Sequence, residues 1–127
     1  TIRTFLGRKC RFDFWVPSYF SPGVYNKPML LKEANAEYGT SLKRAGTYKA
    51  LNRLIQGTAA DQTKKAMVDV YEKLGVTPLI QVHDELNCSV KSDKEAKEIK
   101  NIMETCIELQ VPSNVDYKVK DNWGDAK

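Results

Sequence analysis

The stretch Leu79–Val90, with the sequence LIQVHDELNCSV, decides the fold expected for this chain. Apolar and polar side chains alternate on both sides of a central His-Asp-Glu cluster. A period of two residues is typical of strands with one buried face, so we expect two short strands joined by a turn with Asp84 near its apex. Such a hairpin would hold His83, Asp84 and Glu85 at one exposed point. Three polar residues in a turn usually form only a solvated loop, but carboxylates fixed on strand ends also suit a divalent cation.

Length and composition predict one ordinary domain. The chain has 127 residues, of which 42% are hydrophobic and 28% charged, values typical of a globular protein with a modest core. We expect no membrane segment, because no apolar run approaches the ~20 residues that a spanning helix needs, and no signal-peptide pattern. Three scattered cysteines, without a CxxC pair, favour reduced thiols and argue against a zinc site.

The charge is unevenly distributed along the chain. Residues 1–49 carry 9 Lys and Arg against 3 Asp and Glu, whereas residues 50–127 carry 11 against 13. A basic first part suggests a polyanionic partner, although runs of charge are more often solvated faces. Charge alone therefore indicates nucleic acid only weakly.

A long amphipathic helix is expected upstream of the hairpin. Apolar residues recur every three or four positions from 51 to 74, and Gly75 follows as a stop. Gly57 inside this helix costs roughly 1 kcal/mol relative to alanine, and such a glycine usually permits close packing against another backbone. Asn52 and Gln56 lie four residues apart and project from one side. They are either plain surface amides or amides suited to the acceptors that all base pairs share in the minor groove.

The rest of the chain completes an α+β pattern. We expect strand and turn over residues 1–14, an irregular loop rich in proline and aromatic residues within about 13–47, and a short helix over 30–38 inside it. After the hairpin, Ser92 and Glu95 form a capping box for a helix reaching about residue 110, and a final strand is expected over 115–119. The predicted fold is an antiparallel hairpin sheet packed against helices.

Two motifs resemble one known family. Gln56–Asp61 (QGTAAD), followed after a helix by Gln81–Leu86 (QVHDEL), resembles the C-terminal palm of family A DNA polymerases, the DNA polymerase I type with its phage relatives. The Gln81–Leu86 string is similar to the family's third catalytic motif. Leu6–Arg8 and the tail from Met103 through Asn122 and Trp123 are similar to further family segments.

The resemblance implies a role for each matching residue. Asp84 would be one of two aspartates that bind the catalytic Mg²⁺ pair, which activates the primer 3′-hydroxyl and stabilises the departing pyrophosphate. Glu85 would support that metal site from an outer position, and His83 would contact the primer terminus. Asn52 and Gln56 would touch the minor groove of the primer-template DNA near its last base pair.

Three basic residues are weaker candidates for contacts with the DNA backbone. Arg8, Lys9 and Arg53 are assigned mostly on their charge. Many family members place an arginine four residues before the position of Asn52, where this chain has Tyr48. Lys49 or Arg44 could supply that charge instead.

The resemblance also shows what the sequence lacks. A family A enzyme needs a second aspartate on another motif, and a fingers helix with Lys and Tyr that grips the incoming dNTP. Neither is in these residues. We therefore expect residues 1–127 to be the C-terminal palm part of a polymerase that is split, either by nature into two polypeptides or by truncation. This part would be inactive alone and completed by a complementary segment that supplies the rest of the palm, fingers and thumb. An open sheet edge with exposed apolar surface is expected to follow.

Other functions fit the residues less well. The main alternative is a module that keeps the palm fold and binds DNA or a partner without catalysis. A metal-dependent phosphohydrolase is disfavoured by the single histidine, and a serine hydrolase by the absence of a nucleophile-elbow pattern. The expected location is the cytoplasm of a bacterium or of a phage-infected host.

Overall fold

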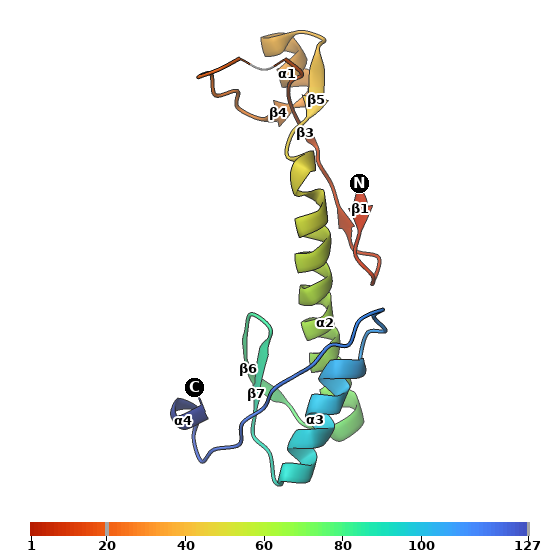
Figure 1. Cartoon of the computed structure of the whole chain (residues 1–127), viewed down its shortest axis with the longest axis vertical. Helices are drawn as coiled ribbons and strands as arrows, with labels where there is room; N and C mark the ends of the chain where they lie inside the picture. Colours follow the sequence, from red (N-terminus) through yellow and green to blue (C-terminus); the bar gives the residue numbers. More distant parts are fainter. Residues whose placement is uncertain (20, 127) are drawn as a thin grey trace. The chain divides into compact units, whose positions relative to one another are not determined.

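The computed structural model describes residues 1–19 and 21–126 and has an α+β fold (Figure 1). In these residues, helices combine with three small antiparallel sheets, and the predicted fold class is confirmed. The chain divides into two compact units, Thr1–Gly57 and Thr58–Lys127. Within the described ranges, no helix combines the length and the apolar character needed to cross a membrane.

The first unit begins with a short hairpin. β1 (Ile2–Arg3) pairs antiparallel with β2 (Lys9–Cys10), which confirms the strand and turn expected there. The turn is closed by backbone hydrogen bonds from the Thr4 N–H to the Arg8 carbonyl at 3.0 Å and from the Gly7 N–H to the Thr4 carbonyl at 2.9 Å. Gly7 has a φ of 85°, which L-residues with a side chain rarely adopt.

The segment expected to be an irregular loop contains regular structure. β3 (Phe14–Pro17) is the middle strand of a sheet with β4 (Met29–Leu30) and β5 (Leu42–Arg44), and α1 (Leu31–Tyr38) follows β4. The helix and its end at Gly39 agree with the prediction. The strands were missed because each pairs with a partner distant in sequence, as Trp15 does with both Met29 and Arg44.

The long predicted helix is present as α2 (Ala50–Leu74), preceded by the 3₁₀ turn η1 (Thr47–Lys49). It ends at Gly75, whose φ of 67° lies in the left-handed region that favours glycine. Its N-terminal turns belong to the first unit and the rest to the second.

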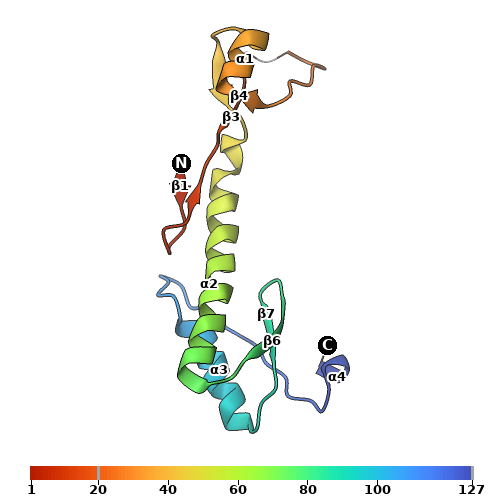
Figure 2. The same cartoon turned by 180° about the vertical axis from the view of Figure 1, so that it is seen from behind.

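The second unit has its core between α2 and α3 (Asp93–Thr105), which lie side by side in both views (Figures 1 and 2). The buried residues Val70, Val76, Ile99 and Ile102 form this core. The capping box of α3 is confirmed, because Ser92 Oγ accepts from the Glu95 N–H at 3.2 Å and Glu95 Oε2 accepts from the Lys91 N–H at 2.7 Å.

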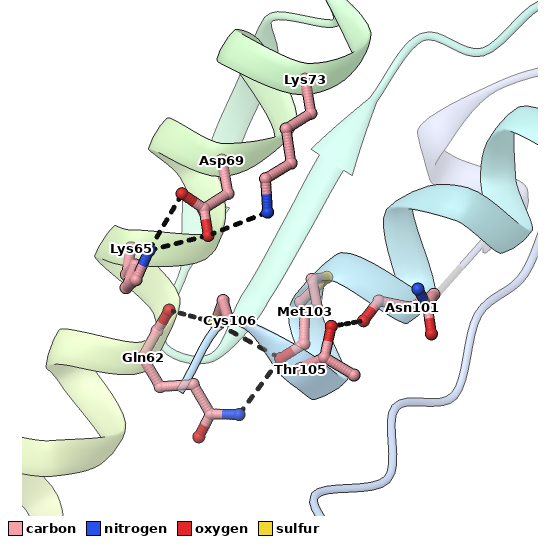
Figure 3. Close-up of polar contacts among 8 residues, drawn as sticks. All are labelled: Gln62, Lys65, Asp69, Lys73, Asn101, Met103, Thr105 and Cys106. Atoms are coloured by element: carbon pink, nitrogen blue, oxygen red, sulfur yellow. Dashed lines mark hydrogen bonds and ion pairs between the residues drawn. The ribbon is translucent and has the colours of Figure 1, made fainter. Parts of the chain in front are cut away.

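Polar contacts reinforce the pairing of α2 with α3 (Figure 3). The Gln62 side-chain amide donates to the Met103 carbonyl at 3.1 Å, and the Cys106 thiol donates to the Gln62 carbonyl at 3.5 Å.

A second set of contacts lies within α2. Buried Asp69 accepts from Lys65 Nζ at 2.9 Å and lies 3.8 Å from Lys73 Nζ. That hydrogen bond to Asp69 raises the pKa of Lys65 above its ordinary value.

The chain after α3 differs from the prediction. α3 ends at Thr105, earlier than the expected residue 110, and residues 115–119 form no strand. The Val115 N–H donates to Glu104 Oε1 at 2.8 Å and the Tyr117 hydroxyl to Asp93 Oδ1 at 3.1 Å, so α3 side chains hold this segment. Alternation over 115–119 indicated a strand, but no neighbouring strand pairs with these residues. A short helix, α4 (Trp123–Ala126), follows.

Candidate functional site

The acidic cluster lies at the tip of the predicted hairpin. β6 (Pro78–Val82) pairs antiparallel with β7 (Glu85–Cys88), and the last pair is Val82 with Glu85. His83 and Asp84 are therefore the two residues of the connecting turn. His83 has a φ of 52°, the left-handed conformation found in the primed turns that match strand twist in two-residue hairpins. The side-chain amide of Gln81 donates to the His83 carbonyl and braces the turn.

The base of the hairpin is anchored and its tip is exposed. Cys88, at the end of β7, packs against the core of the second unit, and burial raises the pKa of its thiol. His83, Asp84 and Glu85 are all exposed. The fold thus presents two carboxylates and the only histidine of the chain to solvent on a short, anchored support.

The residues of this tip do not amount to a complete metal site. Carboxylate oxygens are the donors that Mg²⁺ prefers, and Asp84 and Glu85 supply two carboxylates. Throughout residues 1–19 and 21–126, however, no three His, Cys, Asp or Glu side chains gather where they could hold a metal ion. The expected catalytic metal pair does not fit the donors of this chain alone.

The candidate DNA-contacting residues lie in the first unit, on α2 and on the β1–β2 hairpin. Asn52 and Gln56 are exposed and share one side of the helix. Leu51 and Ile55, in the next row around the helix, are 68% and 59% exposed, so an apolar strip flanks the amides. Lys9 is exposed on β2.

Both arginines that were predicted to contact the DNA backbone make contacts within the protein. Arg8 Nη2 donates to the Gly57 carbonyl at 2.7 Å. The Arg53 guanidinium lies 4.8 Å from the centroid of the Phe12 ring and its Nη1 donates to the Arg11 carbonyl at 3.5 Å. Their positive charge had suggested that both arginines bind DNA. For these contacts within the protein, the sequence carried only one signal, which was the glycine inside the helix.

That glycine marks a close approach, as expected. A Cβ added at Gly57 would lie 2.9 Å from Thr4 Cγ2 and 3.7 Å from Arg8 Nη2. The approaching atoms are side-chain atoms of the β1–β2 turn, where the sequence suggested a second backbone.

Comparison with known proteins defines the class of this chain. The family model described as DNA polymerase family A matches residues 2–125. A DNA-directed DNA polymerase of Pseudomonas phage M6 is 42% identical over 125 residues, covering 98% of this chain and 15% of the phage protein. The thermostable DNA polymerase I of Thermus filiformis is 42% identical over 93 residues, covering 68% of this chain and 11% of that protein.

The chain belongs to DNA polymerase family A. It spans about 15% or less of the length of the relatives named above. The DNA polymerase I of Bacillus caldotenax is also 42% identical, over 88 residues that cover 61% of this chain and 10% of the bacterial protein. No solved structure matches the chain.

Proposed function

We propose that this chain takes part in template-directed DNA synthesis, as part of a family A polymerase that transfers nucleotides from dNTPs to a primer 3′-hydroxyl. The observation that carries the proposal is the exposed Asp84 at the tip of the β6–β7 hairpin, within a chain matched by the family model over residues 2–125.

Asp84 would supply one carboxylate of the catalytic Mg²⁺ site, and Glu85 would support that carboxylate from beside it. When bound, the metal ions would supply electrostatic stabilisation of the attacking and leaving oxygens. Because the described residues hold no complete donor set, the remaining ligands would come from residues outside these 127, in the same polypeptide or in a separate one. His83, next to Asp84 in the turn, would contact the primer terminus.

The exposed apolar surface of the β6–β7 hairpin supports the proposal that a further part of the polymerase packs against it. Leu79, Ile80 and Val82 of β6 are 67%, 39% and 38% exposed, although they are strand residues. A two-stranded sheet is marginal in water without further strands or a covering layer, and apolar residues left open on it mark an interaction surface. A neighbouring part of the palm that covers β6 would also bring the missing carboxylate toward the hairpin.

The first unit would hold the primer-template DNA. The exposed amides of Asn52 and Gln56 can donate to the purine N3 and pyrimidine O2 acceptors that occur in every base pair of the minor groove. Such contacts sense the shape of the terminal pair without reading its sequence. Lys9 would contribute a contact to the phosphate backbone.

The test is complementation of primer extension. The chain is mixed with the related phage polymerase shortened to end before the region that matches this chain, and extension of a labelled primer is measured with Mg²⁺ and dNTPs. We expect extension from the mixture and none from either part alone. Asp84→Ala should abolish it, whereas Glu85→Gln should slow it roughly 10-fold, the usual effect of losing a residue that supports a metal ligand.

The control is Asp116→Ala, which removes another exposed carboxylate of the second unit and should leave extension unchanged. DNA binding without extension in the complemented mixture would contradict the proposal and favour a non-catalytic DNA-binding module.

A further inference from the structure

The β1–β2 hairpin has a concentration of positive charge that its own fold does not require. Residues 1–12 carry Arg3, Arg8, Lys9 and Arg11 and no acidic residue. The strand register places Arg3 directly opposite Lys9, and both residues are exposed. Like charges at directly opposite positions destabilise a strand pair. A polyanion bound across this face would remove that repulsion.

Not all of these cations are equally placed to meet a partner. Arg8 and Arg53 fasten the hairpin and the segment after it to α2, through the Gly57 carbonyl and the Phe12 ring. Arg3 donates to the Gly7 carbonyl at 3.0 Å, which uses only part of a guanidinium with five N–H donors. On the two strands, the cations that face outward are therefore those of the cross-strand pair, Arg3 and Lys9. Arg11, which follows β2, is exposed as well.

Gly57 sets how closely the hairpin approaches the helix. Thr4 Cγ2 would lie only 2.9 Å from a Cβ at position 57. Thr4 cannot yield easily, because it is buried, its N–H donates to the Arg8 carbonyl at 3.0 Å and its Oγ1 accepts from the Arg8 N–H at 3.1 Å. A methyl group at position 57 would displace the whole turn, and with it the cross-strand pair.

On α2, the residues that contact the hairpin lie beside the exposed amides. Residues four apart form a row along an α-helix. The row of Arg53 and Gly57 carries the hairpin, and the adjacent row is that of Asn52 and Gln56, which is exposed. Cations held one row away from minor-groove amides are suited to the phosphates that border a minor groove.

We propose that the β1–β2 hairpin is a phosphate-contacting arm and that Gly57 is its positioning residue. Arg3 and Lys9 meet the backbone of the duplex whose minor groove Asn52 and Gln56 contact. This assignment rests on the proposed function, but it moves the backbone contacts from Arg8 and Arg53 to the cross-strand pair.

The experiment measures binding of the 127-residue chain to a fluorescent primer-template duplex at several salt concentrations. The slope of log K against log salt counts phosphate contacts, and loss of one lysine contact lowers it by about 1. We expect Lys9→Ala to lower the slope by about 1, and Gly57→Ala to lower it by at least as much without removing a charge. Lys94→Ala, a lysine 87% exposed on α3, is the matched charge control and should not change the slope.

A double variant separates positioning from misfolding. Thr4→Ser removes the Cγ2 methyl and keeps the Oγ that accepts from Arg8, so Thr4→Ser combined with Gly57→Ala should restore the wild-type slope. An unchanged slope in Gly57→Ala, or no rescue by Thr4→Ser, would overturn the positioning role. Failure of the wild-type chain to bind the duplex even at low salt would instead contradict the proposed function itself.

Discussion

At the scale of single residues, the turn residue His83 shows how the backbone limits the choice of side chain at the candidate site. Its φ of 52° is tolerated by His, Asn and Asp but is costly for a β-branched residue. We expect His83→Val to lower the free energy of unfolding by about 1–2 kcal/mol and His83→Asn to change it by less than about 0.5 kcal/mol. Urea unfolding measures both. Equal stability of the two variants would contradict a left-handed conformation at this position.

A second prediction at this scale concerns pH. The hydrogen bonds from Lys97 and then from Tyr117 hold the pKa of Asp93 below its ordinary value. A lowered folded-state pKa stabilises the fold above the unfolded pKa, and this contribution disappears as the pH falls through the folded pKa. Wild type should therefore be more stable than Asp93→Asn at pH 6, and the difference should be smaller at pH 2.

The matching measurement is the urea midpoint of both proteins at the two pH values. The expected difference is small, because Asp93 and Lys97 are exposed and such pairs are screened by solvent. A difference that grows toward acid pH would contradict the assigned contacts.

At the scale of elements, the second unit depends on the face that α2 turns toward α3. Val70 is fully buried in that core, whereas Val68 on the same helix is 53% exposed. Val70→Ala should cost about 2–3 kcal/mol, since it removes buried carbon and leaves a cavity. Val68→Ala makes the same chemical change and should cost less than about 0.5 kcal/mol. Similar losses in thermal or urea unfolding would mean that the two faces of α2 are assigned incorrectly.

The elements that the sequence predicted are those defined by local signals. The period of α2, the Ser92 and Glu95 cap of α3 and the alternation around Asp84 each involve residues close together in the chain, and all three are confirmed. The sheet of β3, β4 and β5 depends on partners up to 29 residues apart in sequence, such as Trp15 and Arg44. The expected strand at 115–119 failed for the same reason, because alternation cannot reveal whether a partner strand is present.

The same distinction applies to the candidate site. Motif and alternation placed Asp84 at an exposed turn, and the structure has it there. The contacts of Arg8 with Gly57 and of Arg53 with Phe12 join residues about 40 or more positions apart, so charge alone gave these arginines a role that their geometry does not favour. Only Gly57, unusual within a helix, indicated that something approaches α2 closely.

At the scale of the whole molecule, the described part of the chain provides exposed carboxylates without the further donors that a metal pair needs. The chain spans 15% of its phage relative, and the residues that the structure describes leave the donor set of Asp84 and Glu85 incomplete. We therefore expect Asp84 to act within a larger polymerase. We propose that one exposed carboxylate, and not acidity on the surface in general, carries the reaction.

The most direct test is the single-turnover rate of adding one nucleotide to a primer, measured in the complemented polymerase with Asp84→Asn and with Asp116→Asn. Loss of a metal contact worth several kcal/mol in the transition state predicts a fall of about 1000-fold for Asp84→Asn, and the rate for Asp116→Asn should match wild type. A rate for Asp84→Asn within a few-fold of wild type would contradict the account.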